Sequence, residues 1–199
     1  MSLDMTSGLR IGLLGGSFNP AHAGHLHISE SALRMLDLDQ VWWLVSPQNP
    51  LKSSDGMQTL DARLEQADEI SDVNPRIFPT DIEVDLGTRY TCDTLPALVS
   101  KFPDTAFVWL MGADNLLQFH KWRNWTEIFN IVPVAVFGRP GYSLRATFSV
   151  AARRFARDRW PQAQAKRLAD ARVPAWMLLK IREHPESATR IRAQVNPND

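Results

Sequence analysis

One short segment near the start of the chain collects residues that could handle a phosphate group. It covers residues 15–25 and reads GGSFNPAHAGH. Its glycines let the backbone approach a ligand closely. The helix expected to begin near Gly24 would direct free N–H groups and a positive dipole end at that ligand, for which an anion is the natural choice. His22 and His25 could then both donate hydrogen bonds to one phosphate as charge builds up on it.

The same residues have a plainer interpretation. His22 and His25 could be polar capping residues, and Gly15 and Gly16 could only make a turn. A metal site fails on ligand count, because no nearby cysteine or carboxylate completes a set at a known spacing. A Walker loop is excluded because no Gly-Lys-Ser/Thr follows. The combined pattern, rather than either histidine alone, favours phosphate chemistry.

The elements around this segment predict an α/β fold. Short, continuously apolar runs alternate with stretches of helical spacing, as in a parallel sheet covered on both faces. Strands are expected over residues 10–15, 41–46, 76–82, 106–111, 133–137 and 175–181. Helices are expected over residues 22–38, 59–70, 91–102 and 125–130, with another after the last strand. We therefore expect a doubly wound parallel sheet with its ligand crevice at the carboxyl ends of the strands.

The composition limits the number of domains and the class of protein. The 199 residues are 44% hydrophobic and 22% charged, without a repeat or linker, which favours one domain over residues 1–199. No apolar run reaches the length of a signal peptide or a membrane span, and Cys92 has no partner for an internal disulfide, so a cytoplasmic protein without membrane contact is expected.

Charge narrows the choice of ligands. The formal net charge is zero, which argues against a general nucleic-acid binder. Residues 139–195 nevertheless hold 13 arginines and lysines against 4 acidic residues. This basic third could attract a polyanion such as a nucleoside triphosphate, or it could be a solvated helix face.

GGSFNPAHAGH resembles the GGxFDPxHxGH signature of the nucleotidylyltransferase superfamily. Other segments resemble one branch, the bacterial nicotinate-nucleotide adenylyltransferases. These segments are SPQNPLK at 46–52, RYTCDTL at 89–95, WLMGADNLLQFHKW at 109–122, GRPGYS at 138–143 and SATRIR at 187–192. They follow the family order over nearly the whole chain. The first motif indicates the superfamily, and RYTCDTL with GADNLLQFHKW indicates the branch.

The resemblance implies a Rossmann-like fold and a direct transfer of AMP from ATP to nicotinate mononucleotide, giving deamido-NAD and pyrophosphate in NAD biosynthesis. It makes His22 and His25 the catalytic residues. The ATP site would consist of these two histidines with Gly15, Gly16, Ser17, Phe18, Asp114, Ser187, Thr189 and Arg192. The acceptor site would consist of Lys52, Tyr90, Thr91 and Trp122. Mg²⁺ would arrive on the ATP phosphates, held mainly by substrate oxygens and water.

Two acceptor residues have specific tasks in this resemblance. Thr91, with backbone N–H groups, would hold the nicotinate carboxylate, while Trp122 would stack on the pyridine ring. Plainer roles remain open: Trp122 could be a core residue, Lys52 a solvated lysine and Asp114 a helix cap. Ser187 could likewise be an N-cap, and Arg192 a surface charge.

The sequence departs from the family pattern at two positions. Asn19 stands where aspartate is usual, and Ala188 replaces a common serine. Asn19 keeps an acceptor oxygen but loses a charge. Two rivals stay open. One is a pantetheine-phosphate adenylyltransferase, which shares the first motif, and the other is a nucleotide-binding protein without turnover, which the two departures make conceivable. RYTCDTL and HKW speak against the first rival, and the two retained histidines speak against the second.

Overall fold

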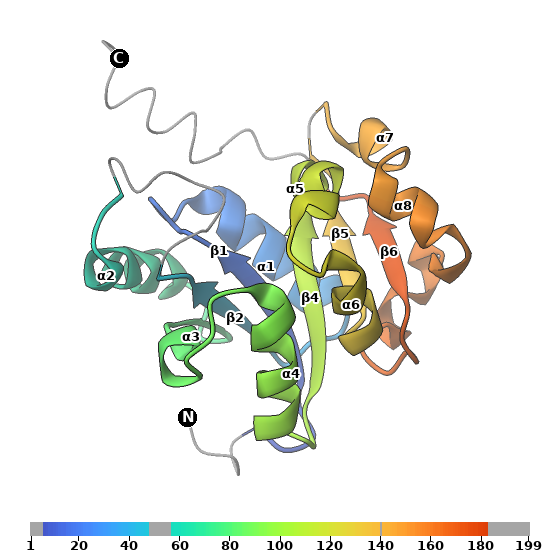
Figure 1. Cartoon of the computed structure of the whole chain (residues 1–199). Helices are drawn as coiled ribbons and strands as arrows, with labels where there is room; N and C mark the ends of the chain where they lie inside the picture. The colour runs from blue at the N-terminus through green and yellow to red at the C-terminus, as the bar shows by residue number, and fades with distance from the viewer. Residues whose placement is uncertain (1–5, 48–56, 140, 183–199) are drawn as a thin grey trace.

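The computed structural model describes residues 6–47, 57–139 and 141–182 of the chain. Within them lies a six-stranded parallel sheet in the order β3-β2-β1-β4-β5-β6 (Figure 1). The strands are β1 (Arg10–Gly16), β2 (Gln40–Val45), β3 (Ile77–Thr80), β4 (Ala106–Gly112), β5 (Val134–Phe137) and β6 (Trp176–Leu179). The predicted α/β class and the parallel sheet are confirmed.

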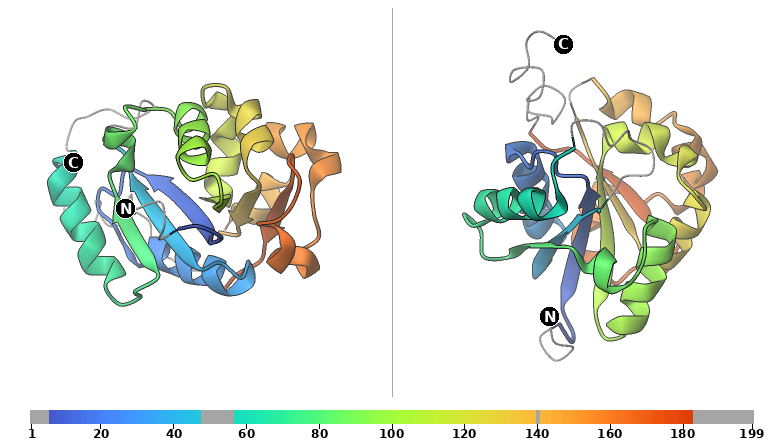
Figure 2. Two further views of the ribbon diagram at one scale, coloured as in Figure 1. Left: turned by 90° about the horizontal axis from the view of Figure 1, so that it is seen from below. Right: turned by 60° about the vertical axis from the view of Figure 1, so that its left-hand side comes forward.

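Helices cover both faces of this sheet (Figure 2). One face carries α1 (Ala23–Met35), α2 (Leu60–Ser71) and the 3-10 helix η4 (Gln162–Arg167). The other carries α3 (Ile82–Asp85), α4 (Thr91–Lys101), α5 (Ala113–Gln118), η2 (Phe119–Lys121), α6 (Trp125–Ile131), α7 (Ser143–Ala146) and α8 (Val150–Arg154). The 3-10 helix η3 (Ala156–Asp158) follows α8. The fold is therefore doubly wound.

The two faces explain why the strands are apolar throughout. Successive side chains of a strand point to opposite faces. Trp42 packs with α4 on one side, while its neighbour Trp43 packs with α1 on the other. Both indoles are fully buried. A strand buried on both sides cannot alternate polar with apolar residues, and the uninterrupted runs in the sequence reflect this.

Two details differ from the sequence-based expectations, and a third expectation is not tested. The strand expected over 76–82 ends at Thr80, whose Oγ1 accepts a hydrogen bond from the backbone N–H of Ile82, and α3 starts there. Helices α3, α5, α7 and α8 were not expected, because four to six residues are too short for a helical period to stand out. The helix expected after β6 falls outside the described residues.

The strand order reverses between β1 and β4. The chain leaves β1 toward β2 through α1, and it leaves β4 toward β5 on the other side of the sheet. In such sheets this switch point, at the carboxyl ends of the strands, is the usual ligand site. Among the described residues, no helix has the length and apolarity that a membrane crossing requires.

Candidate functional site

Two histidines build the amino end of α1. His22 is the N-cap residue, and its Nδ1 accepts a hydrogen bond from the backbone N–H of Gly24 at 3.0 Å. His25 is the third helical residue, and its Nδ1 accepts from the backbone N–H of His22 at 3.2 Å. Together they form a reciprocal capping box, with their ring centroids 3.9 Å apart. The capping interpretation of the sequence is confirmed.

Capping is compatible with phosphate chemistry, because it uses only Nδ1 of each histidine. It also determines which ring nitrogen carries the proton. A backbone N–H can only donate, so Nδ1 of both His22 and His25 must offer a lone pair. In a neutral imidazole the proton then lies on Nε2, the nitrogen on the other side of the ring. The two rings are therefore fixed as Nε2–H donors at the start of a helix.

An aromatic layer holds these rings in place. Phe18 is almost fully buried, with its ring centroid 4.6 Å from that of His25 and 5.2 Å from that of Trp43. The indole N–H of Trp43 donates to Ser29 Oγ at 2.7 Å, and this hydroxyl donates to the carbonyl of His25 at 2.9 Å. Phe18 also has a φ of 45°, a left-handed conformation that persists only where the surroundings hold it.

Arg63 of α2 holds the same loop from the other side. Its side chain is almost fully buried and donates to the backbone carbonyl of Ser17 at 2.6 Å. It also donates to the carbonyls of Ser46 and Pro47 after β2, and of Gln58 before α2, at 2.8, 3.0 and 3.1 Å. Burial lowers the pKa of Arg63 from its usual value.

The sequence interpretation missed Arg63, although a signal was present. Arg63, Ala67 and Ser71 are four residues apart and form the buried stripe of α2. An arginine on a core-facing stripe needs buried hydrogen-bond acceptors. This requirement could have identified Arg63 as a candidate structural residue from the sequence.

Local contacts explain why a glycine stands at position 15 and how the asparagine at position 19 is used. A Cβ atom on Gly15 would lie 2.5 Å from the Trp109 indole of β4, so the glycine permits the close packing of β4 side chains against β1. Asn19 Oδ1 accepts a hydrogen bond from the backbone N–H of Gln58 at 3.2 Å. Only the acceptor oxygen takes part in this bond, and an aspartate would supply the same atom.

Asp114 lies in the first turn of α5, directly after β4. The N-cap of this helix is Gly112, which has no side chain to cap it, and Asp114 Oδ1 lies 3.3 Å from Arg139 Nε. This oxygen is buried and makes no hydrogen bond among the described residues. The ion pair therefore orients the carboxylate at the carboxyl end of β4.

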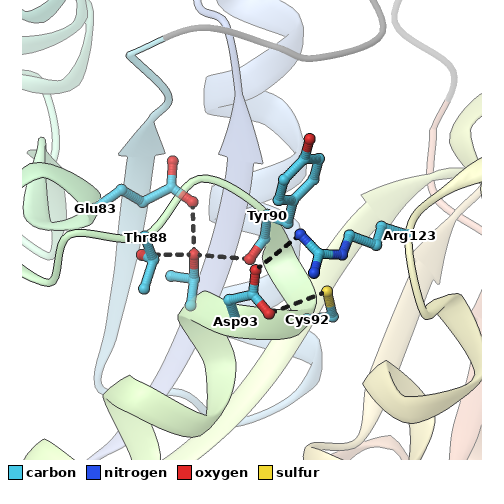
Figure 3. A network of polar contacts seen from close by, with 7 residues as sticks. Glu83, Thr88, Tyr90, Cys92, Asp93 and Arg123 are labelled. Carbon is cyan, nitrogen blue, oxygen red and sulfur yellow. Dashed lines mark hydrogen bonds and ion pairs between the residues drawn. The ribbon is translucent and has the colours of Figure 1, made fainter.

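The acceptor-side residues gather at the start of α4. Thr91 is its first residue, and the N-cap Tyr90 makes no side-chain capping bond. The guanidinium of Arg123 lies 4.8 Å from the centroid of the Tyr90 ring, and its Nη1 is 3.7 Å from Asp93 Oδ2 (Figure 3). Cys92 is buried in the same helix, where burial raises the pKa of its thiol and favours a packing role.

Trp122 connects this region to the segment over residues 15–25, which we call the phosphate loop. It is half-buried at the edge of the core, 4.8 Å from the Phe119 ring and 6.3 Å from the Trp109 ring, centroid to centroid. Trp109 in turn lies against Gly15. Trp109 of β4 thus lies between Gly15 of the expected ATP site and Trp122 of the expected acceptor site.

A buried carboxylate forms a second connection. Glu83 of α3 accepts a hydrogen bond from Thr94 Oγ1 at 2.9 Å, and Thr88 Oγ1 lies 3.0 Å from the same hydroxyl (Figure 3). Burial raises the pKa of Glu83, partly offset by hydrogen bonds from Thr94 and Ser46. Ser46 also donates its backbone N–H to Gly16 and accepts from Arg63. Glu83 therefore links α4 to the phosphate loop.

Several predicted residues fall outside the described part of the chain. They are Lys52, Ser187, Thr189 and Arg192, together with the departure at Ala188. Their roles stay predictions. Among the described residues, no three side chains of His, Cys, Asp or Glu come together as metal ligands would.

Comparisons with known proteins add an independent finding. A family model described as cytidylyltransferase-like matches residues 13–194. A protein of Parvibaculum lavamentivorans is 53% identical over 188 residues, covering 94% of this chain and 93% of its own. One of Methylorubrum extorquens is 51% identical over 186 residues, covering 94% and 100%. Both carry the name "Probable nicotinate-nucleotide adenylyltransferase".

A solved structure agrees on the fold. Plasmodium falciparum nicotinic acid mononucleotide adenylyltransferase complexed with NaAD has a TM-score of 0.65 with this chain at 17% identity. The match covers 92% of this chain and 82% of that one. At this identity, the likeness concerns the arrangement of strands and helices.

Proposed function

Since this chain belongs to the nicotinate-nucleotide adenylyltransferases of the cytidylyltransferase-like family, we infer that it transfers AMP from ATP to nicotinate mononucleotide, giving deamido-NAD and pyrophosphate. One observation in the structure carries this function. His22 and His25 are fixed as paired Nε2–H donors at the start of a helix, at the switch point of a doubly wound sheet.

The proposed reaction is a direct displacement at phosphorus. A 5′-phosphate oxygen of the acceptor bonds to the α-phosphorus of ATP, and the bond from that phosphorus to the pyrophosphate oxygen breaks. Negative charge moves toward the leaving pyrophosphate during this step. Donors that are already oriented can stabilise that charge without reorganisation, which is the role we assign to His22, His25 and the amino end of α1.

The nucleoside part of ATP would lie at the carboxyl end of β4. We propose that Asp114, held by Arg139, accepts hydrogen bonds from hydroxyl or amino groups of adenosine. The buried Oδ1 of Asp114, which makes no hydrogen bond among the described residues, supports this role.

The acceptor would lie at the start of α4. The N-cap side chain accepts no bond from the first N–H groups of α4, and the Asp93 N–H donates to the Tyr90 carbonyl. The N–H groups of Thr91 and Cys92 can therefore serve the nicotinate carboxylate together with the Thr91 hydroxyl. Trp122, half-buried at the edge of the core, can stack on the pyridine ring. We assign Tyr90 to the wall of this pocket, where the Arg123 guanidinium lies over its ring.

Mg²⁺ enters this proposal as part of the ATP complex. The described residues offer no cluster of three metal-ligating side chains, and Mg²⁺ commonly keeps several waters while binding substrate phosphates. The ion would reduce the negative charge of the triphosphate, and the chain itself would orient the phosphates.

A pyrophosphate-release assay tests this function. The purified chain is supplied with Mg²⁺, ATP and, separately, nicotinate mononucleotide, nicotinamide mononucleotide or phosphopantetheine, and the dinucleotide product is identified by mass. We expect rapid release with nicotinate mononucleotide and formation of deamido-NAD. Turnover with phosphopantetheine alone would identify the pantetheine branch instead. ATP binding without pyrophosphate release from any acceptor would indicate a nucleotide-binding protein.

A further inference from the structure

Arg63 is a buried cation whose described partners are backbone carbonyls. Its side chain is 1% exposed and donates to four carbonyl oxygens. No carboxylate among the residues that the structure describes forms an ion pair with it. A buried arginine usually pairs with a carboxylate. An arginine that donates only to backbone carbonyls therefore suggests a specific structural role.

The four carbonyls belong to three separate stretches of chain. Ser17 follows β1, Ser46 and Pro47 follow β2, and Gln58 precedes α2. The β1–β2 ladder ends with the bond from the Ser46 N–H to the Gly16 carbonyl. Beyond it, the guanidinium bonds to all three stretches and acts as their common clamp. Its planar fork can reach acceptors in several directions at once, which a single ammonium group cannot do.

The bond to Ser17 also fixes the neighbouring peptide unit. In a trans peptide the C=O and the following N–H point in opposite directions. Because the Ser17 carbonyl faces Arg63, the N–H of Phe18 faces away from Arg63. Phe18 is the residue with the left-handed φ of 45°, and its ring lies against His25. Arg63 thus holds the strained turn that precedes the paired histidines.

We propose that Arg63 is a positioning residue for AMP transfer: its clamp on the loops after β1 and β2 sets the place of the Phe18 N–H and of the paired histidines. The inference rests on the proposed function. It assigns no contact between Arg63 and substrate. The expected consequence is a loss of turnover in variants that still fold, because displacing a donor by about 1 Å can cost on the order of 10²-fold in rate.

The experiment compares Arg63→Lys and Arg63→Met with Arg10→Met. Arg10 lies at the opposite, amino end of β1, where it donates to Asp170 at 2.7 Å, and it is a matched control for the loss of a well-bonded arginine. Thermal unfolding gives the folded fraction of each protein at the assay temperature. Initial rates over both substrates then give kcat and the two KM values per folded molecule.

We expect Arg63→Lys to lower kcat by roughly 10-fold and Arg63→Met by roughly 10²-fold, while KM for nicotinate mononucleotide stays within 3-fold. Arg10→Met should lower the melting temperature and leave kcat unchanged. The wild-type rate comes first, because an inactive wild type would contradict the proposed function rather than this inference. With an active wild type, Arg63→Lys at more than half of its kcat would overturn the role of Arg63, even where Arg63→Met fails to fold.

Discussion

The amino ends of α1 and α4 are built in opposite ways. In α1, the side chain of His22 caps the helix, and His25 closes the box from inside the first turn. In α4, the N-cap Tyr90 makes no side-chain capping bond. The Asp93 N–H donates to the Tyr90 carbonyl, which leaves the N–H groups of Thr91 and Cys92 for a ligand. The first arrangement fixes side-chain donors in advance, whereas the second leaves backbone donors for an incoming group.

This difference matches two kinds of negative charge. Charge on the transferring phosphates changes during the reaction, and donors that are fixed in advance stabilise the change. Charge on a nicotinate carboxylate is already present when the acceptor binds, so backbone donors there act on selection. We therefore expect substitutions near α1 to act on kcat and those near α4 to act on acceptor choice.

The largest expected effect tests the α1 side. His25→Ala should lower kcat by about 10²–10³, and His22→Ala by somewhat less, because each removes a donor whose bond strengthens as charge develops. KM for ATP should change far less. Steady-state kinetics with both substrates varied measure this. A variant that keeps more than about a third of the wild-type kcat would contradict the role given to that histidine.

Capping needs its own control, because both histidines also stabilise the helix. Asparagine is a good N-cap and glutamine suits the third position of a capping box, so His22→Asn and His25→Gln preserve the cap while replacing the imidazole. Each should melt close to the wild-type temperature and still lose most of its kcat. Full activity in either capped variant would show that the cap alone is what the reaction needs.

A second prediction tests the α4 side. Nicotinate mononucleotide should exceed nicotinamide mononucleotide in kcat/KM by roughly 10²-fold or more, since the carboxamide brings N–H donors against the N–H groups of α4, and each unpaired buried group costs about 1–3 kcal/mol. Thr91→Val should shrink this ratio. Comparable kcat/KM values for the two acceptors in the wild type would refute selection at α4, although AMP transfer itself could still stand.

The two regions also differ in how far the sequence revealed them. Residues 15–25 run without interruption from the end of β1 to the first turn of α1, so their spacing predicted the loop, the helix start and the placing of both histidines there. The sheet was predictable for a similar reason, because a strand buried on both faces leaves an uninterrupted apolar run. Local spacing thus carried both results.

Contacts between distant segments stayed hidden. Arg63 meets Ser17 across 46 residues, and Asp114 meets Arg139 from the next crossover. Such pairs depend on how the elements pack, which no local period records. The network around Glu83 was missed as well, because it begins in α3, a helix of four residues that starts at the last residue of an expected strand.

A third prediction concerns a residue that both acceptors should use alike. Stacking on an aromatic ring contributes about 1–3 kcal/mol per base in nucleic-acid systems, so Trp122→Ala should raise KM for both mononucleotides by roughly 10-fold. Their ratio should stay within a few-fold, because stacking depends little on the substituent. A change in the ratio comparable to that of Thr91→Val would place Trp122 against the carboxylate instead.

The smallest expected effect concerns Glu83, which lies between the two regions. Burial raises the pKa of Glu83, so the fold favours its protonated form. Its contribution to stability is therefore fully present below the unfolded value, about 4.3, and is lost as the pH rises through the higher folded value. Glu83→Gln removes this dependence while keeping the shape of the side chain.

Melting temperatures of wild type and Glu83→Gln, measured from pH 4 to pH 8, test this sign. The melting temperature of the variant should rise relative to that of the wild type as the pH rises. Each kcal/mol of difference in the free energy of unfolding should appear as roughly 2–4 °C in a chain of this size. Glu65→Gln, which removes the same charge from an exposed position of α2, controls for net charge. The hydrogen bonds from Thr94 and Ser46 favour the ionised form and act against the trend, so the gain measures how far burial outweighs them. If the melting temperature of the variant instead falls relative to that of the wild type with rising pH, these hydrogen bonds outweigh burial. An ionised Glu83 would then join the acceptor side to the phosphate loop.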